Sequence, residues 1–179
     1  MKPTVIVLAS GKGERFKASG GEVYKLKALL GGKPVLQHTL DAVRASGLPW
    51  HLEDKGHPGM GDSIAAAVRA TQHAAGWLIL PGDLPLVRGS TLLELALELA
   101  NYDIVVPLYE GQRGHPVGFS AACGPALMGL SGAEGAASVL TTRPVARIPV
   151  EDVGVVTDVD TLDALAAAEA LWQARQTGG

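Results

Sequence analysis

Residues 3–15, "PTVIVLASGKGER", join a short apolar run to a turn that contains two glycines and several charged residues. The run from Pro3 to Ser10 is almost entirely β-branched or apolar, which predicts a strand buried on both faces of a parallel sheet. The turn lacks the Gly-Lys-Ser/Thr of a P-loop and the third glycine of a dinucleotide fingerprint. What remains is Gly11-x-Gly13-x-Arg15, where glycines let backbone N–H groups approach phosphate oxygens and the arginine offers a bidentate donor. The stretch therefore predicts a phosphate-binding loop after a buried strand, with a plain glycine turn as the alternative.

Similar short apolar runs recur along the chain and alternate with helical patterns. The further predicted strands are Trp77–Leu80, Asp103–Leu108, Pro116–Ser120, Val145–Val150 and Val155–Val159. The predicted helices are Lys33–Ser46, Asp62–Ala75, Ser90–Ala100 and Thr161–Arg175, with Asp62 or Ser63, Ser90, and Asp160 or Thr161 as the N-caps. This alternation predicts an α/β fold with a doubly wound sheet and right-handed crossovers. Because no linker or repeat interrupts residues 1–179, we expect one domain.

The composition excludes several classes of protein. With 47% apolar and 18% charged residues among 179, the chain has the make-up of a folded α/β protein. Its one cysteine, Cys123, excludes an intramolecular disulfide and a zinc site of several cysteines, which fits a cytoplasmic location. No segment reaches the roughly 20 apolar residues of a membrane helix, so we expect no membrane partner. The net charge of -3 argues against binding to nucleic acid.

Positive charge is concentrated at the start of the chain. Residues 1–33 contain seven Lys or Arg and two acidic residues, whereas the remainder carries the acidic excess. This asymmetry indicates that the N-terminal segment faces an anionic ligand, with a solvated basic loop as the alternative.

Acidic residues follow two of the predicted strands. In a doubly wound sheet, ligands bind at the carboxyl ends of the strands. Asp83 stands directly after one predicted strand, and Pro85 stops the chain from continuing in the sheet. Asp158 and Asp160 flank Val159, so in an extended segment their side chains point the same way. Carboxylates in such positions suit Mg²⁺, while a turn aspartate and a helix cap are the structural alternatives.

Three other features are candidates for binding. Lys25 precedes an apolar run and a Gly-Gly turn, from where its ammonium can fold back toward phosphates or remain in solvent. The stretch from Gly59 to Ser63, "GMGDS", starts a helix and offers N–H groups and a hydroxyl to a nucleobase or an anion, or simply caps the helix. His115, between a glycine and a proline, has a catalytic and a structural interpretation.

The segments "VLASGKGERF", "KLKALLGGKPVLQHTLDAV", "GMGDSIAAAV", "ILPGDLPLV", "GHPVGFS" and "DVDTLDAL" occur in this order. The series resembles the MobA-like NTP transferases, and within them the molybdenum cofactor cytidylyltransferase branch, from about residue 3 to about residue 170. The resemblance implies a Rossmann-like three-layer α/β/α fold with a mostly parallel sheet. It further implies Mg²⁺-dependent transfer of CMP from CTP to molybdopterin, with release of pyrophosphate, and a molybdoenzyme as a partner.

The resemblance also implies roles for individual residues. Those implied as catalytic are Arg15, Lys25 and Asp83. Those implied to bind the nucleotide are Leu8, Ala9, Ser10, Gly11, Lys12, Gly13, Gly59, Gly61 and Ser63. Gly114, His115 and Pro116 would lie on the acceptor side, and Asp83 with Asp160 or Asp158 would bind the metal.

The chain departs from the family pattern in three places. The loop reads Leu8-Ala9-Ser10-Gly11, close to the Ala-Ala-Gly form of the cytidylyltransferase branch, which favours CTP. The segment 47–58 is short, which implies a sheet that lacks one strand-helix unit after residue 47. Residues 132–137 read "GAEGAA" where many relatives have Gly-Asp-x-Gly-Ala-Arg. This last change leaves open a sugar or polyol phosphate as the acceptor. The short segment 47–58 leaves open a weakly active nucleotide-binding protein that delivers to a molybdoenzyme.

Overall fold

A computed structural model of the chain describes residues 2–9, 18–21 and 24–178. The strands are β1 (Thr4–Leu8), β2 (Leu29–Leu30), β3 (Lys33–Pro34), β4 (Trp50–Glu53), β5 (Gly76–Pro81), β6 (Ile104–Tyr109), β7 (Gln112–Arg113), β8 (Val117–Ser120) and β9 (Val145–Pro149). The α-helices are α2 (Val35–Ser46), α3 (Met60–Ala70), α4 (Gly89–Glu98), α5 (Gly124–Met128) and α6 (Leu162–Gly178). Short 3-10 helices are η1 (Lys25–Lys27), η2 (Ala121–Cys123), η3 (Ala136–Thr141) and η4 (Val153–Val156).

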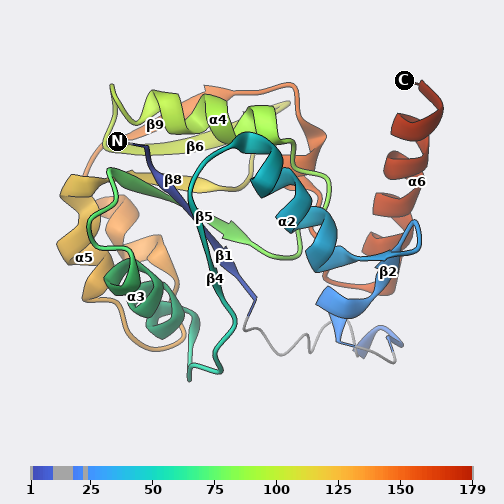
Figure 1. Cartoon of the computed structure of the whole chain (residues 1–179), viewed down its shortest axis with the longest axis horizontal. Helices are drawn as coiled ribbons and strands as arrows, with labels where there is room; N and C mark the ends of the chain where they lie inside the picture. The colour runs from blue at the N-terminus through green and yellow to red at the C-terminus, as the bar shows by residue number, and fades with distance from the viewer. Residues whose placement is uncertain (1, 10–17, 22–23, 179) are drawn as a thin grey trace.

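A mixed sheet of seven strands forms the centre of the molecule (Figure 1). Its order is β4-β1-β5-β8-β6-β7, and β9 pairs with β6. The pairs of β1 with β4, of β1 with β5 and of β6 with β9 are parallel, whereas β8 is antiparallel to both β5 and β6. Since β8 is antiparallel to both β5 and β6, these two strands run in the same direction. The strands β4, β1, β5, β6 and β9 therefore all run one way, and the sheet is mostly parallel.

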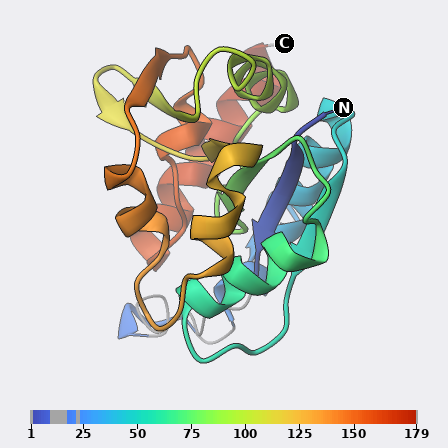
Figure 2. The same ribbon diagram turned by 90° about the vertical axis from the view of Figure 1, so that its left-hand side faces the viewer.

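Helices cover both faces of this sheet. In β1, Val5 and Val7 pack with α2 and α4, whereas Ile6 points to the other face and packs with α3 and α5. All three side chains are fully buried. Alternate residues of a strand point to opposite faces, so the continuous apolar run of β1 is what a sheet between two helical layers needs. Figure 2 looks onto the layer formed by α3 and α5. The fold is therefore the predicted three-layer α/β/α arrangement.

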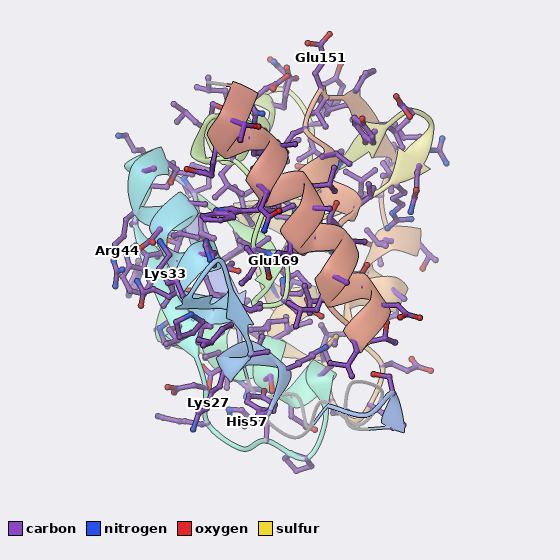
Figure 3. All side chains as sticks on the ribbon, turned by 90° about the vertical axis from the view of Figure 1, so that its right-hand side faces the viewer. Lys27, Lys33, Arg44, His57, Glu151 and Glu169 are labelled. Carbon is purple, nitrogen blue, oxygen red and sulfur yellow. The ribbon has the colours of Figure 1, made fainter. Side chains whose placement is uncertain are left out.

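Helix α6 lies to one side of these layers, next to the β2–β3 hairpin (Figure 3). Glu169 of α6 accepts a hydrogen bond of 3.1 Å from the backbone N–H of Gly31. A Cβ atom at Gly31 would lie 2.5 Å from the ring of Trp172, and the φ of this residue is 58°, so glycine is favoured where the hairpin meets the helix. Only Ala168 is fully enclosed among the described residues of α6, and the helix is otherwise half-buried or exposed.

Two predicted elements differ in the structure. No strand was expected in 47–58, yet β4 lies there and forms the edge of the sheet, leading to α3 without a helix between them. The segment Val155–Val159 was expected to be a strand, but 153–156 is a 3-10 helix followed by extended chain. A Cβ atom at Gly154 would lie 2.2 Å from the carbonyl O of Leu86, so this segment packs across the sheet edge instead of joining the ladder.

The helix caps were predicted less well than the helices. Helix α3 begins at Met60 after an extended Gly59, so Asp62 and Ser63 lie inside its first turn and do not cap it. Helix α4 begins at Gly89 with Arg88 before it, and not with Ser90 as the cap. Of the two caps proposed for α6, Thr161 is the one used, since its Oγ1 accepts 3.1 Å from the N–H of Ala164. Among the described residues, no helix combines the length and apolar character needed to cross a membrane.

Candidate functional site

The carboxyl end of β5 places Asp83 at the edge of the sheet. Beyond the strand, the N–H of Gly82 donates 2.8 Å to the carbonyl O of Leu8, so the chain stays beside β1 for one more residue. A Cβ atom at Gly82 would lie 3.0 Å from that carbonyl and from Leu36. The hydroxyl of Thr39 in α2 donates a hydrogen bond of 2.8 Å to the carbonyl O of Gly82 and stabilises the turn. Asp83 is consequently fixed in a buried position, 8% exposed.

The segment before α6 brings two further carboxylates to Asp83. The N–H of Val159 donates 3.0 Å to the carbonyl O of Asp83, and the Val159 side chain is fully buried. Asp158 and Asp160, on either side of this anchor, each place a carboxylate oxygen within 4.8 Å of one on Asp83. The structure thus brings together the three acids that were predicted to share this edge, and Asp160 is not the helix cap.

Lys25 lies between two of these acids. Its Nζ is 2.8 Å from Oδ2 of Asp83 and 2.9 Å from Oδ1 of Asp160. The 3-10 turn η1 that carries Lys25 is tied to the end of β1, because the hydroxyl of Tyr24 donates 3.1 Å to the carbonyl O of Ala9. Lys25 was predicted to face phosphates, and in this structure it is the counter-ion of the acids.

The acids and the lysine shift one another's pKa. Burial raises the pKa of Asp83, and Lys25 offsets this only in part. A hydrogen bond with Asp160, together with burial, raises the pKa of Asp158 to about 6. The same hydrogen bond and the contact with Lys25 hold the pKa of Asp160 below its usual range. Burial alone would lower the pKa of Lys25, but Asp83 and Asp160 outweigh it, so this pKa is raised. Among the residues that the structure describes, these three carboxylates share one ammonium, an arrangement that favours a further cation.

The predicted acceptor stretch, Gly114 to Pro116, is the segment that connects β7 to β8. The N–H of Gly114 donates 3.0 Å to Pro107, which continues the ladder with β6, and the N–H of His115 donates 2.9 Å to the carbonyl O of Val155. A Cβ atom at Gly114 would lie 2.2 Å from that same oxygen. Pro116 is buried, whereas the ring of His115 is exposed. The backbone of this stretch thus holds η4 in place, three residues before Asp158.

The predicted base-binding stretch is packed against a loop from the other half of the chain. The N–H of Gly61 donates 2.9 Å to the carbonyl O of Gly132, and Asp62 accepts 3.1 Å from the N–H of Gly132. Cβ atoms would lie 2.2 Å from the carbonyl O of Gly132 at Gly59 and 2.6 Å from that of Glu134 at Gly61. Both glycines therefore have a packing role. Ser63 is buried, and its hydroxyl donates 3.3 Å to the carbonyl O of Gly59.

The remaining predicted nucleotide residues are partly beyond what the structure describes. Leu8 ends β1, and Ala9 is buried with its N–H donating 2.9 Å to the carbonyl O of Glu53. Ser10, Gly11, Lys12, Gly13 and Arg15 lie outside the described residues.

One buried acid was missed from the sequence. Glu53 ends β4 with its side chain 5% exposed, and its two oxygens are 2.9 Å from Nε2 of His51 and 2.8 Å from Nε2 of His57. Hydrogen bonds from the two rings hold the pKa of Glu53 below its usual value despite the burial. In the sequence, His57 forms no metal-ligand spacing with another histidine. The only available signal was the position of Glu53 inside the shortened segment 47–58.

An α/β sheet with charged groups gathered at the carboxyl ends of its strands is typical of Rossmann-like proteins, which bind their ligands there. Comparison with known proteins assigns the family. The profile of the MobA-like NTP transferase domain matches residues 41–148, more than half of the chain. The chain therefore belongs to this family of nucleotidyltransferases.

Individual relatives are distant. The bifunctional protein GlmU of Desulfitobacterium hafniense is 31% identical over 111 residues, which cover 50% of this chain and 24% of that protein. The chain thus aligns with about a quarter of this relative.

Solved structures share the fold. Rv0371c from Mycobacterium tuberculosis H37Rv has a TM-score of 0.79 at 23% identity, covering 95% of this chain and 98% of that one, and it is also known as a complex with manganese. The molybdopterin-guanine dinucleotide biosynthesis protein A of Archaeoglobus fulgidus has a TM-score of 0.68 at 20% identity, covering 95% and 98%.

Proposed function

We propose that this chain transfers a nucleoside monophosphate from an NTP, with CTP favoured, to a phosphate-bearing acceptor, and that molybdopterin is that acceptor. The observation that carries the proposal is the meeting of Lys25, Asp83 and Asp160 at the carboxyl edge of the sheet. An acceptor phosphate oxygen attacks the α-phosphorus, the bond to the β-phosphate oxygen breaks, and pyrophosphate leaves. Such a reaction needs positioning and charge neutralisation and no protein nucleophile.

The three carboxylates fit a hard divalent cation. Asp83 and Asp160, with Asp158, offer only oxygen ligands, and their acidic excess is neutralised in part by Lys25. We propose that these residues would hold Mg²⁺, which would supply positive charge to neutralise the phosphate oxygens. The manganese complex of Rv0371c supports a divalent cation in this fold.

The other proposed roles rest on the resemblance to the family. Lys25, once released by the carboxylates, contacts the α-phosphate, and Gly11, Lys12, Gly13 and Arg15 hold the rest of the triphosphate. Leu8, Ala9 and Ser10 would also bind the nucleotide, and Ser63 with Gly59 and Gly61 would bind the base. Gly114, His115 and Pro116 lie on the acceptor side, next to η4.

A sugar or polyol phosphate is the second candidate acceptor. It is favoured by residues 132–137, which lack the acid and the base found in many relatives and instead pack their backbone against Gly59 and Gly61.

Pyrophosphate release tests the proposal. We expect release with CTP, Mg²⁺ and molybdopterin, at a rate well above that with ATP, GTP or UTP. A panel of sugar and polyol phosphates under the same conditions tests the second candidate. Metal-dependent binding of CTP without turnover on any acceptor would contradict the enzymatic proposal and favour a delivery protein.

A further inference from the structure

A pocket of about 420 Å³ lies between the β6–β7 hairpin, η4 and α6. Asp158 lines it, and the same carboxylate belongs to the acidic cluster with Asp83 and Asp160. The pocket therefore borders the proposed metal site at one shared residue, Asp158. Figure 3 shows α6 along one side of this region and the yellow β7 hairpin beside it.

The wall formed by α6 is apolar. Ala164, Ala167 and Leu171 line the pocket, and their spacing places them on one face of the helix. Leu171 is 36% exposed, and Ala168 on another face of α6 is fully buried against the hairpin β2–β3 side of the molecule. The apolar wall is thus accessible to a ligand, because its side chains are not packed into the core.

The opposite wall is polar and acidic. Tyr109, Glu110 and Gln112 come from the hairpin, and Thr157 lies next to Asp158. Among the lining residues that the structure describes, two are carboxylates and none is Lys, Arg or His. Carboxylates accept hydrogen bonds and repel a second negative charge. This wall therefore suits a ligand whose organic end donates hydrogen bonds and is neutral or cationic.

The backbone holds Glu110 in a defined place. Glu110 and Gly111 have φ of 48° and 82° and form the two-residue turn between Tyr109 and Gln112, which pair across the hairpin. Both positive φ values are typical of a tight hairpin turn. The base of the hairpin is tied down by the N–H of Gly114 to Pro107 and by the N–H of Val150 to Leu108. The carboxylate of Glu110 is thus attached to a rigid element.

We propose that this pocket binds the organic end of the acceptor and that Glu110 selects against acceptors that carry a carboxylate or a sulfate at that end. The acceptor class is then a phosphomonoester whose other end carries hydroxyl or amino donors and no carboxylate or sulfate. This proposal rests on the proposed function, because the acceptor phosphate must reach the cluster that Asp158 shares.

Three sugar phosphates provide matched probes: glucose 1-phosphate is neutral at its organic end, glucosamine 1-phosphate is cationic there, and glucuronic acid 1-phosphate is anionic. Their binding to the full chain with Mg²⁺ and without nucleotide is measured by ligand-observed NMR. We expect the first two to bind about three- to tenfold more tightly than the third, because Glu110 is exposed and solvent screens part of its charge.

Glu110→Lys reverses the charge of the wall and should remove this preference or invert it. Glu94→Lys makes the same change on the exposed face of α4 and serves as the matched control. Ala167→Trp fills the pocket and should weaken all three probes. Equal binding of the three probes, no binding of any, or an equal response to Glu94→Lys would overturn the proposal.

A separate titration with CTP and Mg²⁺ keeps the two proposals distinct. If CTP binds and the sugar phosphates do not discriminate, the acceptor pocket is wrong and nucleotide binding stands. If the sugar phosphates discriminate and CTP does not bind, the proposed nucleotidyl transfer is wrong.

Discussion

Two buried acids near the sheet differ in how many donors surround them. Asp152 is 3% exposed and accepts hydrogen bonds from the N–H of Arg88 at 2.8 Å, Thr91 at 2.7 Å, the N–H of Gly154 at 2.9 Å and Arg175 at 3.4 Å. These donors belong to α4 and the residue before it, to η4 and to α6, so Asp152 links these three helices. Asp83, by contrast, shares one ammonium with Asp160, and Asp158 adds a third carboxylate. Burial with complete pairing indicates an architectural acid, and burial with surplus charge indicates a cation site.

Substitution of Asp83 and of Asp152 should differ most in the effect on turnover. We expect Asp83→Asn to lower the rate of pyrophosphate release by about three orders of magnitude, because it removes a proposed metal ligand next to the reacting phosphates. The unfolding free energy, measured by urea denaturation, should be unchanged or higher, since the variant relieves an acidic excess. Near-normal turnover in Asp83→Asn would remove this residue from the site. Asp54→Asn, in the exposed loop after β4, is the control.

Asp152→Asn should show the opposite pattern. We expect the unfolding free energy to fall by about 2 kcal/mol, because donors from α4, η4 and α6 lose a charged acceptor. Turnover of the folded fraction should be retained within about twofold, since Asp152 lies outside the proposed site. A variant with unchanged stability and impaired turnover would show that surplus charge does not distinguish the two acids.

Lys25→Met tests whether the ammonium and a divalent cation compete for the same carboxylates. Without divalent cation, the variant should lose about 1 kcal/mol of stability, because Asp83 and Asp160 lose their counter-ion. Mg²⁺ should then raise the melting temperature of Lys25→Met more than that of the parent chain. Lys27→Met, two residues away in η1 and exposed, should respond as the parent does. An equal Mg²⁺ response in all three proteins would contradict the competition.

Glu53 is a third buried acid, and we expect its substitution to have the smallest effect of those considered, on the unfolding free energy. Glu53→Gln should cost about 1 kcal/mol at pH 7, where the carboxylate accepts from two histidines. The pKa of Glu53 is lower in the folded chain than its ordinary value of 4.5. Its contribution is therefore complete above that value and disappears as the pH falls through the folded pKa. Denaturation at several pH values should show the gap between parent and variant closing in acid, and a gap that widens there would contradict the assignment.

Much of the fold follows from patterns that act over short distances. The apolar run of β1 and the alternation of strands and helices predicted the layered sheet correctly, and the edge rule placed Asp83 beside Asp158 and Asp160. Strand β4 was missed because "WHLE" has only four residues and a mixed pattern typical of an edge. The strand expected at Val155–Val159 was wrong because Val155 and Val159 are buried by packing into the core without pairing in a ladder.

The pairings at the site were harder to predict. Lys25 reaches acids 58 and 135 residues further along the chain, so no local signal identifies its partners. The packing role of Gly59 and Gly61 depends on a loop some 70 residues away in the sequence. Tertiary contacts of this kind decide which acids are paired with a basic side chain. They therefore also decide which acids can bind a cation.

Calorimetric titration of CTP into the full chain, with and without Mg²⁺, tests the central claim most directly. The account predicts that CTP binds with Mg²⁺, that chelation weakens the binding strongly, and that Asp83→Asn weakens it in the same way while Asp54→Asn does not. Binding of CTP that is equally tight without a divalent cation, or in Asp83→Asn, would contradict the assignment of the acidic cluster as the metal and nucleotide site.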